Sequence, residues 1–441
     1  MAAKRGTTSV AIREDVIVIG GGLAGSVAAI EAAETGATVR LVTHKKSTLR
    51  HASGLIDVLG YNGSTEPIAD PFAALDDLPA EHPYSIAGET AIREGLDRFD
   101  EITGDTYHGS HTDTNALIPT FGGTVKPTAR YPAAAAAGIA SDERPMLIVG
   151  FEAMTEYNGE MLADHLESSG VPFDVEGVEC TLPGEYAHDS RVTRFAKRLD
   201  VNETVDHEGE AVGIREALAE TVKPHLGAAE RVGFPAFLGD EHTDDVRTDL
   251  ERYLGVDVFE IPMGPPSYPG IRLADQLKSA VDEAGVRISA GNPVVGYEAE
   301  NGEITSVTVD SKGREVPYHA DEFVLATGGL VGKGIDSSRE DGVEEPIFDC
   351  HIPHPEDRYE WFDEQAFGDQ PFAHFGVVVD EAMRPLDSSD SPEFDNLRAA
   401  GAIIGGADTV AEKSQSGVSL ATAVVAGEEA GKQAAKHEVT Q

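Results

Sequence analysis

The sequence predicts an α/β fold built on a parallel sheet, and three stretches of the chain carry that prediction. An apolar, β-branched run over residues 15–19 leads directly into a glycine-rich turn and then into a helical pattern. Short alternating runs between 294 and 319 are separated by the turn sequences ENG and SKG, which is typical of a β-meander. A later apolar strand and a long helical pattern close the chain. This order predicts a Rossmann-like unit with a β-meander.

The first of these stretches has the spacing of a nucleotide-binding turn. Gly20, Gly22 and Gly25 follow the strand in a G-x-G-x-x-G pattern. Gly20 permits the tight turn, Gly22 lets a phosphate approach the backbone, and Gly25 lets the helix pack on the strand. The start of the helix adds free N–H groups and a positive dipole end. We therefore predict that this turn binds a nucleotide phosphate.

The second strand, over 38–43, lacks the acidic residue that usually follows in such folds. Thr43 stands where a carboxylate would bind the ribose hydroxyls, and His44, Lys45 and Lys46 come next. Three ligands are compatible with this: an NADP-like molecule whose 2′-phosphate meets the lysines, FAD held less tightly at the ribose, or FMN, which presents a terminal phosphate to the turn. These residues alone leave the three open.

The later segments favour a flavin. "IRLADQLKSAVDEAGVRIS" predicts a helix and a strand, the meander follows, and "ADEFVLATGG" runs as a strand into the A-T-G-G turn. This order resembles the fumarate-reductase-like branch of the two-dinucleotide-binding flavoproteins. In that branch the last helix points its positive N-terminal end at the flavin pyrimidine ring and favours the anionic reduced form. The resemblance implies flavin contacts at Thr327, Gly328, Gly329, Gly405, Gly406 and Gly417.

Three stretches carry a closer resemblance. "THKKSTLRHASGLIDVLG", "IPMGPPSYPGIRLADQL" and "GGADTVAEKSQSGVSLATA" resemble the B subunit of anaerobic glycerol-3-phosphate dehydrogenase. The resemblance implies a flavoprotein with FMN, or alternatively FAD. It also implies two partners, an FAD-bearing A subunit together with an iron–sulfur C subunit, which pass electrons from glycerol 3-phosphate to membrane quinone. Two other functions stay open: a non-catalytic flavin electron-transfer or assembly component, and a stand-alone fumarate-reductase-like oxidoreductase.

Residues near the second strand are candidates for flavin and phosphate binding. By the same resemblance, Ser53, Gly54 and Asp57 lie near the flavin ring. Lys45 and Lys46, with Arg50, form the densest basic group early in an acidic chain. Local positive charge is needed to admit an anion against so negative a background. We therefore predict that these lysines face a phosphate.

Three residues are candidates for catalysis. Arg272 follows a proline-rich loop that could hold a bidentate guanidinium toward a phosphate or carboxylate. His351 and His354 are candidates for the general base that removes an alcohol proton during hydride transfer. These histidines have no further ligands close in sequence, so we predict no metal site.

Composition limits the class of protein. The chain has 78 acidic and 34 basic residues and a net charge of −44, which argues against a nucleic-acid partner. This balance resembles that of cytosolic proteins of salt-loving archaea, where salt screens the self-repulsion. Two cysteines are too few for an ordinary iron–sulfur cluster. The short polar leader has no apolar segment, and no run approaches a membrane span. We expect a cytoplasmic protein that meets the membrane only through a partner.

The length of 441 residues predicts more than one domain. We expect a discontinuous flavin domain over 10–75 and 270–441. The intervening 76–269 is expected to form an inserted domain that covers the flavin face as a substrate, cap or partner-binding unit.

Overall fold

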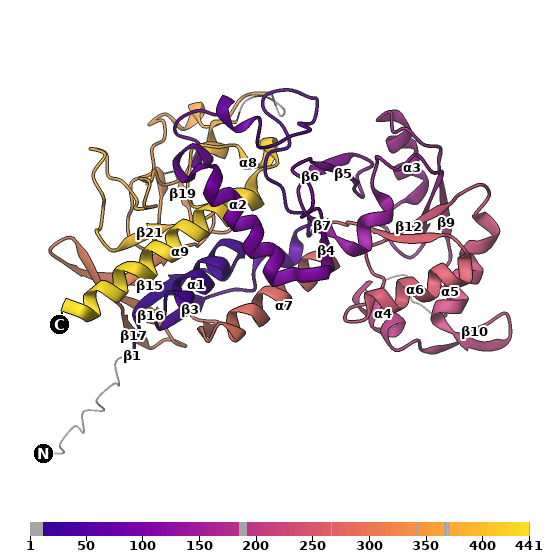
Figure 1. Ribbon diagram of the computed structural model, residues 1–441, viewed down its shortest axis with the longest axis horizontal. Coiled ribbons are helices and arrows are strands. Elements are labelled where there is room, and N and C mark those ends of the chain that lie inside the picture. Colours follow the sequence, from indigo (N-terminus) through magenta and orange to yellow (C-terminus); the bar gives the residue numbers. More distant parts are fainter. Residues whose placement is uncertain are drawn as a thin grey trace, which may run out of the picture.

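The computed structural model describes residues 12–184, 192–265, 267–339, 342–365, 368 and 370–440. The polar leader, and positions 10, 11 and 441 of the expected flavin domain, lie outside these residues. Figure 1 shows two lobes: the larger is built from both ends of the described chain, and the smaller from its middle.

A five-stranded parallel sheet organises the larger lobe. Its central strands are buried, apolar runs, as expected where a parallel sheet is covered on both faces. The register sets Val18 opposite Leu41 on one side and Val324 on the other. In spatial order the strands are β14 (Arg287–Ala290), β3 (Val39–Thr43), β2 (Val16–Ile19), β18 (Glu322–Leu325) and β21 (Leu397–Ala399).

Four long helices belong to the same lobe. The helix predicted after the glycine turn packs against the last helix of the chain, and both contact the sheet. The remaining two helices pack against these, each from a different part of the chain. The four are α1 (Leu23–Glu34), α2 (Pro83–Thr103), α7 (Tyr268–Glu283) and α9 (Gln415–Thr440).

Glycines allow these helices to approach closely. A Cβ at Gly427 of α9 would lie 2.4 Å from the Ala28 carbonyl oxygen of α1. A Cβ at Gly95 of α2 would lie 2.9 Å from the Leu420 backbone of α9. Both distances are shorter than van der Waals contact, so a larger residue would force the helices apart.

The predicted meander is present as a second, four-stranded sheet. It continues through a parallel pairing with the first strand of the described chain. The strands in spatial order are β1 (Ile12–Arg13), β17 (Glu315–His319), β16 (Glu303–Asp310) and β15 (Val294–Glu300).

The smaller lobe contains another parallel sheet. Its order is β13 (Asp257–Ile261), β12 (Arg231–Pro235), β8 (Met146–Phe151) and β9 (Val175–Cys180). A hairpin of β10 (Thr204–His207) and β11 (Glu210–Gly213) also belongs to it. Its helices are α3 (Gly159–Ser168), α4 (Val192–Asp200), α5 (Ile214–Val222) and α6 (Thr243–Leu254).

Two short antiparallel strand pairs lie between the lobes (Figure 1), and in the chain the second falls within the first. They pair β4 (Tyr107–His108) with β7 (Tyr131–Pro132), and β5 (Ala116–Pro119) with β6 (Val125–Thr128). Farther along the chain, β19 (Asp336–Ser338) pairs with β20 (Gly342–Glu344).

The core of the smaller lobe begins later in the chain than the expected inserted domain. Ile92, Leu96 and Phe99 of α2 belong to the core of the larger lobe, where α2 packs against α9. The second core runs from Ala140 to Tyr268. The division into two domains remains a proposal, and we now place its first boundary near residue 140 rather than 76.

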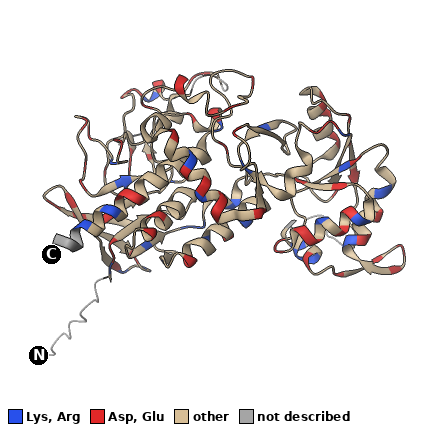
Figure 2. Cartoon of the chain, in the orientation of Figure 1, with Lys and Arg blue, Asp and Glu red and all other residues tan. Residues whose placement is uncertain are grey.

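Acidic side chains are dispersed over both lobes (Figure 2). The two cysteines are free and buried in different cores, Cys350 in the larger lobe and Cys180 in the smaller. Within the described part of the chain, no helix combines the length and the apolar character needed to cross a bilayer.

Candidate flavin site

The carboxyl ends of β2, β3 and β18 meet at one edge of the parallel sheet, which we call the carboxyl edge. Gly20 N–H donates to Val42 at 2.9 Å, and Ala326 N–H donates to Ile19 at 2.8 Å. The chain runs from β2 outward to β3 in one direction and later to β18 in the other. Parallel sheets bind ligands at such a switch point, outside the carboxyl ends of their strands.

The three motif glycines have distinct surroundings at this edge. Gly20 has a φ of +118°, and a Cβ there would lie 2.1 Å from the Ala326 carbonyl oxygen. A Cβ at Gly25 would lie 1.8 Å from the Gly20 carbonyl oxygen, so the helix packs directly on the turn. A Cβ at Gly22 would meet nothing within 4 Å. The first and third glycines are therefore required by packing, whereas the second faces open space that a phosphate can approach.

The A-T-G-G turn directly follows β18 and lies at the carboxyl edge, next to the glycine turn. Thr327 Oγ1 is buried and has no hydrogen-bond partner among the described residues. A Cβ at Gly334 would lie 2.5 Å from that oxygen, and a Cβ at Gly329 would lie 2.7 Å from the Ala402 carbonyl oxygen. Gly328 has a φ of +84°. The turn is thus closely packed and leaves one buried hydroxyl for a ligand.

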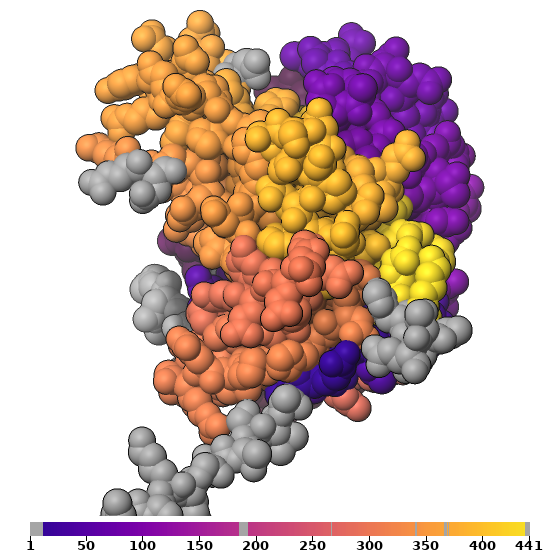
Figure 3. Space-filling view, turned by 90° about the vertical axis from the view of Figure 1, so that its left-hand side faces the viewer, coloured from indigo at the N-terminus to yellow at the C-terminus, as the bar shows by residue number. Residues whose placement is uncertain are grey.

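The start of α9 meets the loop that follows β3. Asp57 N–H donates to Ser416 Oγ at 3.0 Å. A Cβ at Gly417 would lie 2.7 Å from the Asp57 carbonyl oxygen and 2.1 Å from the Tyr84 hydroxyl. That hydroxyl donates to the Val58 carbonyl at 2.7 Å. Gly417 therefore allows two distant parts of the chain to join. At the end of the larger lobe seen in Figure 3, early (purple) and late (orange and yellow) segments also lie side by side on the surface.

Ser53 and Gly54 hold this loop in shape. Ser53 Oγ accepts the Leu55 N–H at 3.3 Å, and the Gly54 carbonyl accepts the Tyr107 hydroxyl at 2.8 Å. Gly54 has a φ of +77°, and a Cβ there would lie 2.6 Å from the Pro269 Cβ at the start of α7. Their predicted contact with a flavin ring stays a prediction.

Gly405 and Gly406 are enclosed by backbone. A Cβ at Gly405 would lie 2.7 Å from the His374 carbonyl oxygen, and one at Gly406 would lie 2.4 Å from that of Glu81. Packing alone accounts for both glycines, so their predicted flavin contact remains untested. The same packing brings His374, which no sequence pattern singles out, next to Gly405 and Gly406.

The structure also pairs Asp57 with a residue that the sequence analysis missed. Lys126 of β6 lies with its Nζ 2.7 Å from Asp57 Oδ2, while Oδ1 is buried and has no partner among the described residues. Burial raises the pKa of Asp57 above its ordinary value, although Lys126 and Lys413 favour its charged form. No sequence pattern relates Lys126 to Asp57, because the two lie far apart in the chain, Lys126 on β6 and Asp57 in the loop after β3.

A second missed group lies just before α9. His82 Nδ1 accepts the Tyr84 N–H at 3.0 Å, which leaves Nε2 to carry the proton toward Glu412, 3.1 Å away. Glu412 ends the short helix α8 (Thr409–Glu412) and also accepts the Ser414 hydroxyl at 2.8 Å. Burial alone would raise the pKa of Glu412, but these hydrogen bonds lower it below its ordinary value. The sequence signal for His82 was its place before Pro83, at a helix start.

The three basic residues predicted to face a phosphate, Lys45, Lys46 and Arg50, have different surroundings. Lys45 and Lys46 are exposed, whereas Arg50 forms an ion pair with Asp275 of α7 at 3.0 Å. The Thr43 hydroxyl donates to the Lys45 carbonyl at 3.0 Å, so it stabilises its own loop. The two lysines remain candidates for a phosphate contact, and Arg50 instead fastens the loop to α7.

The three predicted catalytic residues do not converge. The Arg272 guanidinium binds Glu260 of β13 at 2.6 Å and also the Gly239 carbonyl, so it joins the two lobes. His351 is exposed. His354 Nδ1 lies 2.7 Å from the Ile352 carbonyl oxygen, and its ring lies edge-on to Trp361. Their catalytic roles remain predictions. The Arg272 guanidinium already binds the Glu260 carboxylate of the protein itself.

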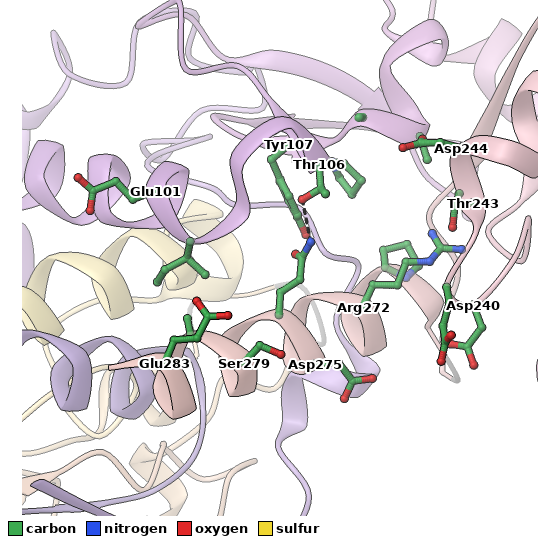
Figure 4. Close-up of a pocket in the computed structure, with 18 of the residues that line it drawn as sticks. Glu101, Thr106, Tyr107, Asp240, Thr243, Asp244, Arg272, Asp275, Ser279 and Glu283 are labelled. Atoms are coloured by element: carbon green, nitrogen blue, oxygen red, sulfur yellow. Dashed lines mark hydrogen bonds between the residues drawn. The ribbon is translucent and has the colours of Figure 1, made fainter. Parts of the chain in front are cut away.

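Arg272 lies beside a cavity of about 970 Å³ between the lobes (Figure 4). One side comes from α7, with Asp275, Ser279 and Glu283, and another from Thr106 and Tyr107. The cavity also reaches Ile30 and Glu34, at the end of α1 farthest from the glycine turn. It is therefore distinct from the carboxyl edge.

The carboxyl edge fits a flavin nucleotide. The glycine turn and the start of α1 offer free N–H groups to a phosphate. Thr327 Oγ1 and Asp57 Oδ1 are buried oxygens without partners among the described residues, and such groups normally find one. Among the described residues, no group of histidines, cysteines and carboxylates has the arrangement of a metal site.

Comparisons with known proteins agree with this geometry. Residues 15–418 match the family described as FAD binding domain. A probable anaerobic glycerol-3-phosphate dehydrogenase B subunit from Halobacterium salinarum is 54% identical over 95% of this chain and 97% of its own. The B subunit from Actinobacillus pleuropneumoniae is 27% identical over 95% of this chain and 99% of its own. The open form of a flavocytochrome c3 fumarate reductase covers 96% of this chain and 79% of its own, with 12% identity and a TM-score of 0.45.

The family match and the H. salinarum relative confirm the predicted fold and the predicted resemblance. The Rossmann-like sheet, the meander and the closing helix occur in the order that the sequence indicated. The H. salinarum relative and this chain align over nearly their whole lengths, so the similarity extends well beyond a shared nucleotide turn. The chain therefore belongs to the B-subunit family of anaerobic glycerol-3-phosphate dehydrogenases, within the FAD-binding-domain flavoproteins.

Proposed function

We propose that this chain is a flavin-bearing subunit of an anaerobic-type glycerol-3-phosphate dehydrogenase. The complex would oxidise sn-glycerol 3-phosphate to dihydroxyacetone phosphate and pass electrons through an iron–sulfur partner to quinone. The observation that carries the proposal is the near-complete alignment, at 54% identity, with the H. salinarum relative. The carboxyl edge supports it, because glycine turn, buried hydroxyl and α9 start lie together there.

Within this proposal the protein's own groups have defined tasks. A bound flavin supplies the acceptor for the hydride that leaves the substrate alcohol. The start of α1 holds the flavin phosphate, and the N-terminal end of α9 favours negative charge near the ring. The partners would be the FAD-bearing A subunit together with the membrane-linked iron–sulfur C subunit, so contact with the inner face of the membrane would be indirect.

A second function has one observation in its favour. Of the predicted catalytic side chains, Arg272 is bound to Glu260, and His351 and His354 have separate environments. This arrangement favours a flavin that relays electrons from the FAD-bearing partner without oxidising substrate itself.

Anaerobic mixing with glycerol 3-phosphate separates these functions. We expect the flavin absorbance of the purified chain to bleach on mixing. Bleaching only after the FAD-bearing partner is added would establish the relay function instead. Bleaching by dithionite alone, even with both partners present, would reject the proposed substrate.

We propose FMN as the cofactor, with FAD as the alternative. The strand that would recognise an adenosine ribose ends in Thr43, whose hydroxyl is engaged with the Lys45 carbonyl. The family description, in contrast, names FAD. Heat release followed by chromatography should yield FMN; recovery of FAD in equal amount to the protein would contradict this assignment.

Charge reversal of Lys45 and Lys46 tests the phosphate contact. We expect Lys45→Glu/Lys46→Glu to weaken flavin or substrate retention about tenfold, because each exposed lysine would lose a charge-assisted contact. The measurement is equilibrium dialysis in about 1 M KCl, where a Debye length of roughly 3 Å removes long-range attraction. Lys278→Glu/Lys312→Glu is the matched control on exposed residues elsewhere. Unchanged retention of both ligands in the first variant would discard the phosphate role.

A further inference from the structure

An ion pair between Arg272 and Glu260 connects the two lobes. Arg272 lies on α7, which packs in the larger lobe, and Glu260 lies on β13 of the smaller lobe. Their contacts are 2.6 Å from Nη1 to Oε2 and 3.1 Å from Nη2 to Oε1. Nη2 also donates to the Gly239 carbonyl. This is the paired geometry in which arginine binds a carboxylate most specifically.

Both charges are largely withdrawn from solvent. The Glu260 side chain is 2% exposed and that of Arg272 is 19% exposed. Glu260 Oε1 also accepts the Leu238 N–H at 2.7 Å, so the carboxylate is bonded within its own lobe as well. Removing one partner of such a pair leaves the other charge buried and uncompensated. The pair therefore resists separation of the lobes at this point.

The start of α7 also contacts the smaller lobe at a second point, because Tyr268 lies in that lobe's core and its hydroxyl donates to the Thr193 carbonyl at 3.1 Å. The cavity of about 970 Å³ lies beside Arg272 and separates α7 from the segment that contains Asp240 and Thr243. In Figure 4 the Arg272 side chain extends from α7 toward that segment, while Asp275 and Ser279 stay on the α7 side.

The same helix, α7, also contacts residues 49–54 of the loop that follows β3. A Cβ at Gly270 would lie 2.1 Å from the Leu49 carbonyl oxygen and 2.5 Å from that of Ala52. Asp275, one turn farther along α7, binds Arg50 at 3.0 Å. The first turns of α7 thus contact the 49–54 loop on one side and the smaller lobe on the other. A helix transmits a displacement because its backbone hydrogen bonds keep it rigid.

We propose that Arg272 and Glu260 are a positioning pair that sets the 49–54 loop through α7. The pair couples the placement of the smaller lobe to the shape of the loop that leads to Ser53, Gly54 and Asp57. Its effect on cofactor binding rests on the proposed flavin function, whereas its effect on the loop does not.

Hydrogen–deuterium exchange of the full chain tests the coupling directly. Glu260→Gln keeps the side-chain shape and the acceptor for Leu238 but removes the charge. We expect amides of residues 49–54 and 236–242 to exchange about tenfold faster, with the β2 and β18 amides unchanged. Arg272→Gln should give the same pattern, and the double variant should be no worse than either single one, because both remove one interaction.

The flavin provides the second readout. In Glu260→Gln we expect the Kd of added flavin to rise about tenfold and the visible absorption band to change shape. Arg252→Gln, which breaks an exposed pair with Asp249 on α6, is the control and should change neither readout.

Each outcome decides a separate point. Exchange of 49–54 within twofold of the wild type, in both single variants, would overturn the proposal. Faster exchange with unchanged flavin affinity would overturn the positioning role toward the cofactor. Faster exchange in a chain that takes up no flavin in any variant would support the coupling and count against the proposed function alone.

Discussion

Alanine at position 25 should deprive the protein of its flavin and lower its unfolding free energy by at least about 2 kcal/mol. The new Cβ would lie 1.8 Å from the Gly20 carbonyl oxygen and 3.3 Å from the Ala326 Cβ. The first of these is a backbone atom in a turn that is itself packed on β18, so no side-chain rotation can relieve the clash. The helix start would move away from the turn, and its N–H groups would no longer face one phosphate position.

Gly22→Ala is the matched variant that should affect flavin binding without affecting packing. Gly22 has a φ of −86°, which any residue adopts, and a Cβ there would meet no protein atom within 4 Å. We expect its unfolding free energy to stay within about 1 kcal/mol of the wild type, while flavin retention falls because the methyl group occupies the phosphate approach. Denaturant unfolding and flavin absorbance provide both readouts. A Gly25→Ala protein with normal flavin content would refute the predicted role of the turn.

Replacing Arg398 by methionine should cost about 3–5 kcal/mol of unfolding free energy at pH 8. Arg398 of β21 pairs with Glu322 of β18 inside the parallel sheet, and each side chain is 3% exposed. The substitution leaves the Glu322 carboxylate buried with no cation beside it. Loss of a surface pair has a much smaller cost, so Arg13→Met, which breaks the exposed contact with Asp321, should change stability by less than about 1 kcal/mol.

The effect of Arg398→Met on stability should depend on pH, because Glu322 has a shifted pKa in the folded protein. Burial raises the pKa of Glu322 from 4.5 to about 7, even with Arg398 opposing. Between these values the folded protein keeps a proton that the unfolded chain releases, so this group's contribution to stability falls as pH rises from 4.5 through 7. Without Arg398 the pKa of Glu322 in the folded protein rises further. The loss of unfolding free energy in Arg398→Met should therefore be smaller at about pH 5 than at pH 8. Glu322→Gln/Arg398→Met should remove the deficit at both values; a deficit independent of pH would contradict the account.

The sequence predicted the parts of the fold that depend on local pattern. The strand ending at Ile19, the glycine turn and the helix after it are contiguous, so their order and spacing can be read from one short stretch of sequence. The meander was visible because its turns carry ENG and SKG. The glycines at 20, 22 and 25 could be placed in this turn for the same reason, and their contact with a phosphate stays a prediction.

The remaining features depend on contacts between distant residues. The apolar stripe of α2 shows that the helix is buried, but it contains nothing that selects α9 as its partner, so the sequence could not assign α2 to the core of the larger lobe. Arg272 was predicted from its own charge and proline-rich neighbourhood, whereas its partner Glu260 lies on a strand of the other lobe. Lys126 was missed because nothing in its own neighbourhood indicates Asp57.

The place of β14 in the sheet sets an order of events during synthesis. It pairs with β3, yet the whole smaller lobe lies between these two strands in the chain. That lobe is contiguous and can complete its own core as it leaves the ribosome, whereas β2 and β3 must wait for β18, β21 and α9. The nascent protein therefore carries an apolar β2–β3 pair whose outer edges stay open until β14 and β18 are made, and which α9 covers only at the end of translation. We infer that late synthesis is when this chain most needs chaperones.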